Sequence, residues 1–252
     1  MKPTAFKVNP RKLGYFEMFR CARNPVEGLL GCALKIFLGP SDDGYGMLSF
    51  GDELDRRTVD DLPRRVQQAT ENYRAKVEKL GFVPGFVYSL ESYGLQEAHG
   101  IVYRHKSGTA AVSIAFARNI HGPVETVTTV VGFNTPLDDD TYVMTSNNKR
   151  MLKKPPGWDC EYMPGAAPKD VFERHQERVE RSGGTPRKVR SDDDLENLVL
   201  NCENEETAFN FQRGVYVKMT RADVKKGTRL KADYDRYGGR PPGEEDEDDY
   251  RD

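Results

Sequence analysis

The residues that could do chemistry are few and scattered along the chain, and His175 is the most suggestive of them. It falls on the apolar stripe of an expected helix, between Val171 and Val179, so its ring should point into the core. With Arg178 nearby on the same helix, a buried imidazole could bind an anion or act as a general base. The plainer interpretation, which we prefer, is a core histidine bonded to a carbonyl or hydroxyl group.

A second set of polar residues lies at the end of the last expected strand. Ser146 and Asn147 place a hydroxyl and an amide there, just before a long loop that carries Trp158, the sole tryptophan. Such groups could form the polar rim of a ligand pocket, with Trp158 as part of its wall. They are also ordinary turn-forming residues, and this plainer interpretation is the one we prefer.

Metal and cofactor chemistry has little support in the sequence. His99 and His105 lie on one face of a strand, but a metal site would also need Cys160 or His175 as a third ligand. The acidic run at 138–140 lacks the glycine and distal glutamate of a calcium loop. No phosphate-binding loop, dinucleotide fingerprint, nucleophile elbow or zinc-protease motif is present. We therefore predict no metal and no cofactor, and the balance leans away from an enzyme.

The segment from Arg213 to Lys231 is strongly basic and is followed by an acidic tail. Residues 233–252 contain nine acidic and three basic side chains, although the whole chain has a net charge of only −2. The segment could bind nucleic acid by neutralising phosphates, and the tail could shield it at low salt. The candidate nucleic-acid-binding residues are Lys218, Arg221, Lys225, Lys226 and Arg229.

The spacing of apolar residues predicts the elements that would position these residues. Its period changes from about 3.6 residues, typical of a helix, to 2 residues, typical of a strand, at Gly81. A helix is expected over 61–80, with Gly81 ending it. Alternating segments then predict five consecutive antiparallel strands, a meander. The expected strands are 85–91, 96–106, 109–118, 125–134 and 141–147. A loop is expected over 148–167.

The two faces of the expected sheet differ in bulk. One face carries large apolar residues, which should pack against the helices at 61–80 and 168–182. They are Val112, Ile114, Phe116, Val127, Val131 and Phe133. The other face carries small and hydroxylated residues, which suit solvent, a close second layer or the floor of a cavity. They are Ala111, Ser113, Ala115, Ala117, Thr126 and Thr128.

These observations predict an α+β fold in five parts: an N-terminal segment of helix and loop (1–59) packed on the core, a core domain (60–182), a basic linker (183–193), a C-terminal helical segment (194–232) and a disordered acidic tail (233–252). The apolar run Val26 to Leu38 is too short to cross a membrane and reads as a buried helix. Four cysteines without a CxxC pair favour a reduced, cytoplasmic setting.

The expected function is a soluble binding or accessory module for a small ligand or a protein partner, with no membrane partner. The alternatives are a hydrolase that uses His175 with a nearby carboxylate, and nucleic-acid binding through residues 213–231. The layout resembles no characterised family closely enough to choose among them.

Overall fold

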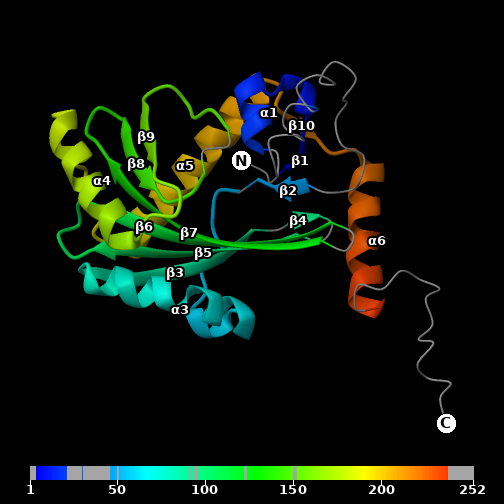
Figure 1. Ribbon diagram of the computed structural model, residues 1–252, viewed down its shortest axis with the longest axis horizontal. Helices are drawn as coiled ribbons and strands as arrows, with labels where there is room; N and C mark the ends of the chain where they lie inside the picture. Colours follow the sequence, from blue (N-terminus) through cyan, green and yellow to red (C-terminus); the bar gives the residue numbers. More distant parts are fainter. Residues whose placement is uncertain are drawn as a thin grey trace, which may run out of the picture.

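The computed structural model describes residues 4–21, 30, 46–49, 51–90, 92–93, 96–121, 124–149 and 152–237. The chain is α+β, as expected: a six-stranded sheet and a four-stranded sheet are combined with helices (Figure 1). The helix expected at 26–38 and the acidic tail beyond residue 237 lie outside the described residues.

The large sheet contains the expected antiparallel strands in the expected order, β3-β5-β6-β7-β8, and then β9. Their bounds are β3 Phe82–Leu90, β5 Gln96–His105, β6 Ala111–His121, β7 Val124–Pro136, β8 Tyr142–Ser146 and β9 Trp158–Tyr162. Strand β9 runs parallel to β8, with Tyr142 opposite Trp158. The expectation of a continuous loop over 148–167 is therefore wrong, because its middle part completes the sheet.

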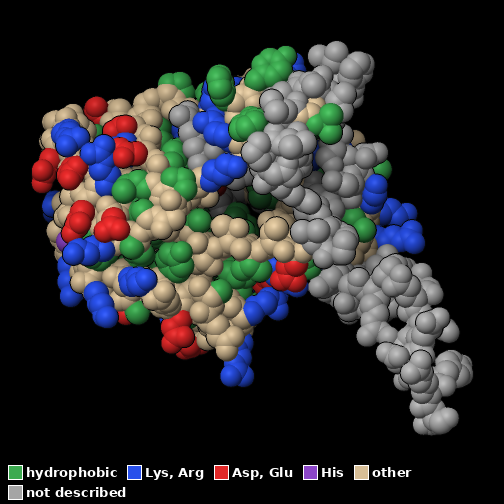
Figure 2. All heavy atoms as spheres, viewed as in Figure 1, with side chains coloured by type: hydrophobic (Ala, Val, Ile, Leu, Met, Phe, Trp, Pro, Cys, Tyr) green, Lys and Arg blue, Asp and Glu red, His purple; other side chains and the backbone are tan. Residues whose placement is uncertain are grey.

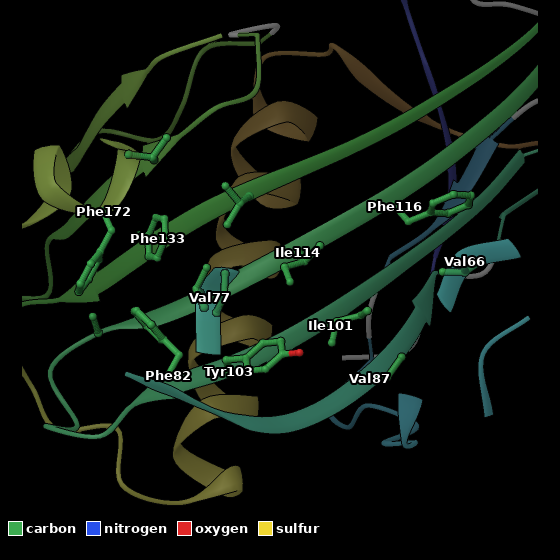
Figure 3. Packing of buried hydrophobic residues seen from close by; sticks show 14 of the residues in the cluster. Val66, Val77, Phe82, Val87, Ile101, Tyr103, Ile114, Phe116, Phe133 and Phe172 are labelled. Atoms are coloured by element: carbon green, nitrogen blue, oxygen red, sulfur yellow. The ribbon is translucent and has the colours of Figure 1, made fainter. Parts of the chain in front are cut away.

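The bulky face of this sheet forms the main core. Helix α3 (Arg64–Lys79) and helix α4 (Pro168–Ser182) cover it, as predicted. Figure 3 shows Val77 from α3 near Ile114, Phe172 from α4 near Phe133, and Val66 from α3 beside Phe116. Gly81 and Gly183 end the two helices at positive φ, a backbone conformation that glycine adopts without strain.

Val127 departs from this pattern, because 53 % of its surface is exposed. Strands β6 and β7 extend well beyond the helices, as Figure 1 shows, and Val127 lies on this extension opposite Arg118. Its place in the expected core is therefore wrong, although the alternation that suggested it is correct.

The opposite, small-residue face is covered by helix α5 (Asp192–Gln212), which packs Leu195, Leu198 and Val199 toward the sheet. Its first turn has a capping box between Ser191 and Asp194. The segment before α5 is fixed to the large sheet, since Pro186 pairs with Leu137 and Val189 is buried.

A second sheet, absent from the sequence interpretation, has the strand order β10-β1-β2-β4. Its strands are β1 Ala5–Val8, β2 Gly46–Leu48, β4 Ser92–Tyr93 and β10 Tyr216–Lys218. Helix α1 (Tyr15–Cys21) lies next to it, and helix α6 (Arg221–Tyr237) stands at the end of the large sheet (Figure 1). Because α6 reaches Tyr237, the first residues of the expected tail are helical.

One buried carboxylate joins three parts of this region. Glu17 on α1 is 1 % exposed and accepts hydrogen bonds from the backbone N–H groups of Gly14 and Lys153, both at 2.7 Å. Its Oε2 also lies 2.5 Å from the guanidinium of Arg213, just after α5. Burial alone would raise the pKa of Glu17, but these donors outweigh it and lower the pKa, so the group is ionised.

Candidate functional site

A pocket of about 210 Å³ lies between the small-residue face of the large sheet and helix α5. The sheet contributes mostly small side chains, including Ala111, Ser113 and Ala115, and Gly132 adds none. Tyr88 extends across the sheet here: a methyl group on Gly100 would come within 2.3 Å of its ring, so Gly100 leaves room for the tyrosine. The sheet face thus forms the floor of a cavity, one of the three options that the sequence left open.

Two residues that line the pocket each have a polar side-chain atom that is buried without a hydrogen-bond partner. These atoms are the indole Nε1 of Trp158 and the side-chain oxygen Oδ1 of Asn134. A buried donor or acceptor that lacks a partner costs about 1–3 kcal/mol, so native proteins rarely leave one unpaired. The walls of the pocket therefore contain one unpaired donor and one unpaired acceptor.

The charged residues of the pocket lie on its α5 side. Lys154 hydrogen bonds to the carboxylate of Glu206, and its ammonium group is 5.5 Å from the centre of the Trp158 ring. Burial would lower the pKa of Lys154, but Glu206 outweighs it and raises the pKa. Lys154 and Glu206 therefore form a compensated ion pair in one wall of the pocket.

Glu203, one turn before Glu206 on α5, has no such partner within the described residues. Burial, with a smaller contribution from the Glu206 charge, raises the pKa of Glu203 to about 7. Its carboxyl group can therefore gain or lose a proton near neutral pH. The neighbouring thiol of Cys202 stays protonated, because burial raises its pKa, so it is not poised as a nucleophile.

A larger and mostly apolar hollow of about 730 Å³ continues from the pocket toward the small sheet. The two share Ala115, Val130 and Asn148 as lining residues. Phe6 and Met47 of the small sheet line its far side. Figure 2 shows a hollow near the centre of the side of the molecule that is viewed.

The structure separates the five expected ligand-binding residues. Ser146 and Trp158 line the pocket, as a polar rim and wall should. The side chain of Asn147 instead joins two backbone segments: it accepts a hydrogen bond from Val131 N–H and donates one to Ala166 O. Asn147 therefore has a structural role.

His175 and Arg178 lie on the other side of the sheet. His175 is 0 % exposed, and its two ring nitrogens contact the hydroxyl groups of Thr135 (2.9 Å) and Thr145 (3.2 Å). Arg178 donates hydrogen bonds to Met144 O and Thr145 Oγ1, and it lies 2.5 Å from Asp159 Oδ1. Burial, with a smaller contribution from the Arg178 charge, lowers the pKa of His175 to about 3, so its ring is neutral. This packing matches the core histidine that the sequence analysis preferred.

A different histidine lies in a hydrogen-bonded chain that the sequence did not reveal. His99 Nδ1 is 2.9 Å from Ser89 Oγ, and its Nε2 is 3.0 Å from Glu97 Oε1. An ionised carboxylate only accepts hydrogen bonds, so Nε2 carries a proton, and in the neutral ring Nδ1 can accept the Ser89 proton. Arg65 holds Glu97 from the other side. Ser89 and His99 are directly opposite across β3 and β5, a pairing that only the strand register brings together.

The remaining predictions concern metal and nucleic acid. Within the described ranges, no group of three or more His, Cys, Asp or Glu side chains could hold a metal ion. Of the expected nucleic-acid-binding residues, Lys218 ends β10 and the other four lie on α6. Asp223 on α6 is bonded to Lys7 of β1, so this acid fixes the helix to the small sheet.

Comparisons with known proteins yield no match to a family model, a curated protein or a solved structure. Among the described helices, none is both long and apolar enough to cross a membrane.

Proposed function

We propose that this protein is a binding module for a small molecule, held between the small-residue face of the large sheet and α5. The observation that carries the proposal is a pocket whose walls contain the indole N–H of Trp158 and the amide oxygen of Asn134, both buried and unpaired. In folded proteins, such buried atoms normally have a hydrogen-bond partner, which a bound molecule can supply.

The size of the pocket limits the ligand. A cavity of about 150 Å³ holds a molecule such as benzene, and drug-sized pockets begin at roughly 300 Å³. At about 210 Å³ this pocket fits one ring with a short substituent. A longer apolar group could continue into the neighbouring hollow through the shared opening at Ala115 and Val130.

Filling the pocket should abolish binding without unfolding the protein, and Gly132→Val is the variant to use. A β-carbon at Gly132 meets Ser146 at 3.6 Å, an ordinary contact, so the added methyl groups extend into space that the ligand needs. Valine also suits a strand. Native mass spectrometry of the purified full chain should show a bound small molecule that is lost in Gly132→Val.

Thr126→Val is the matched control, since it places the same side chain at an exposed site on the same strand. This control should retain the adduct. Equal adducts in the wild type and Gly132→Val would contradict the proposed site.

The chain Ser89–His99–Glu97 supports a second candidate function, a serine hydrolase. In this candidate the catalytic base is His99, at a half-buried site on the α3 side of the sheet. His175, the base expected from the sequence, is buried in the core. His99 would remove the proton from Ser89 Oγ, and Glu97 would stabilise the imidazolium that forms.

A fluorophosphonate probe tests this candidate directly. Ser89 Oγ would attack phosphorus and release fluoride, leaving a stable covalent adduct that mass spectrometry can locate. Labelling at Ser89 should fall at least tenfold in His99→Gln, while the same substitution at His105 should leave it unchanged. Absence of labelling at Ser89 in the wild type would exclude the hydrolase candidate and leave the binding module unaffected.

A further inference from the structure

The charges in the pocket do not balance within the described residues. Lys154 and Glu206 compensate each other through their hydrogen bond. Glu203 adds a second carboxyl group to the same lining, and Lys154 attracts it from a distance without an ion pair or hydrogen bond among the described side chains. When Glu203 is ionised, the pocket therefore has one uncompensated negative charge.

The uncharged lining also favours a cation. Asn134 Oδ1 is a buried acceptor without a donor, and an ammonium group has three N–H bonds to offer. The aromatic rings of Tyr88 and Trp158 line the same space, and aromatic faces attract cations. An anionic ligand would instead have to compete with Glu206 for Lys154 and would lie close to Glu203.

The unpaired indole N–H of Trp158 adds one further requirement. It needs an oxygen or another acceptor, which an ammonium group cannot supply. A ligand that satisfies both unpaired atoms therefore has an amine and an acceptor on one small body.

From this balance we infer that the pocket takes a small organic cation, a protonated amine joined to a body the size of one ring that carries an oxygen acceptor. The ammonium group pairs with Glu203 and Asn134, and the oxygen accepts from Trp158. This inference rests on the proposed function, because it names the ligand class of the same pocket.

Three probes that differ in one group separate the possibilities. Tyramine, tyrosol and 3-(4-hydroxyphenyl)propanoate share a phenol and end in an ammonium, a hydroxyl and a carboxylate group, respectively. Titration of the full chain at pH 8 should give a dissociation constant for tyramine at least tenfold below that of tyrosol, with the propanoate weakest. In Glu203→Gln the affinities for tyramine and tyrosol should become equal within about threefold, while Thr126→Val should keep the wild-type order.

A proton count supplies an independent readout. At pH 6.5 much of Glu203 is protonated, since its pKa is about 7, and an arriving ammonium group should displace that proton. Calorimetry in two buffers with different heats of ionisation should therefore show proton release for tyramine in the wild type and none in Glu203→Gln.

These experiments test the preference for a cation separately from small-molecule binding in the pocket. If tyrosol or the propanoate binds as tightly as tyramine, or Glu203→Gln keeps the preference for the amine, the cation assignment is wrong and the pocket still binds ligands. If Gly132→Val binds all three probes as well as the wild type does, the pocket itself is the wrong site.

Discussion

The wild-type protein should lose stability as the pH falls from about 6.5 toward 4, and His175→Gln should remove much of that loss. The buried ring has a pKa of about 3, below the ordinary value of 6.5. The unfolded chain therefore takes up a proton at His175 over this range and the folded chain does not, which favours unfolding as the pH falls. The contribution is about 1.4 kcal/mol for each pH unit between the two pKa values.

Urea unfolding at pH 7, 6, 5 and 4 measures this effect. Glutamine can still bond to the hydroxyls of Thr135 and Thr145, but it does not titrate. Glu203 acts in the opposite direction between pH 4.5 and 7, because its pKa is raised, so the difference between wild type and variant isolates His175. Gln176→Ala, at an exposed position of the same helix, should keep the wild-type slope. Parallel wild-type and His175→Gln slopes would show that the ring is not held neutral by burial.

Glu17→Ala should be among the most destabilising single substitutions, by about 3–5 kcal/mol. It would leave the Arg213 guanidinium and the N–H groups of Gly14 and Lys153 without their acceptor in the interior. The midpoint of urea unfolding at pH 7 measures the change. The pKa of Glu17 is lowered in the folded chain, so the full difference in stability between wild type and Glu17→Ala should be present above pH 4.5, the ordinary pKa of a glutamate. The difference should shrink as the pH falls below that value.

Glu125→Ala is the control for this substitution. Glu125 also pairs with an arginine, Arg118, but its side chain is exposed, and such pairs contribute about 0–1 kcal/mol. A Glu17→Ala variant no less stable than Glu125→Ala would show that the buried network does not join α1 to the rest of the chain.

The fold class followed from short-range patterns. Leu62, Val66 and Val77 repeat at helical spacing, and Val112 and Ile114 alternate, so local periodicity is enough to predict α3, β6 and the face that joins them. Strand β9 was missed although Trp158–Tyr162 alternates between apolar and acidic residues, because this segment is only five residues long and follows two prolines and a glycine. The small sheet was also hidden, since its strands are no more than four residues long and pair across the whole chain.

The candidate site was predictable only in outline. Alternating small residues from Ala111 to Ala117 allowed a cavity floor as the less favoured of three options, and Ser146 and Trp158 line the pocket above it. Lys154, Glu203 and Glu206 gave no signal, because charged side chains in a loop or on a helix usually face water. Only the packing of α5 against the sheet brings these three into one pocket with Asn134.

The pairing of β1 with β10 also governs how the protein is made. Phe6 pairs with Lys218 and Val8 with Tyr216, so residues more than two hundred positions apart form neighbouring strands. During synthesis the large sheet and its two covering helices can assemble while β10 is still inside the ribosome. Strand β1 can pair with β2 early, but its other edge must wait for β10 from the last part of the chain. A chain arrested before residue 216 would have a nearly finished core, but β1 would have one unpaired edge. The attachment of α1 through Glu17 and Arg213 would form almost as late.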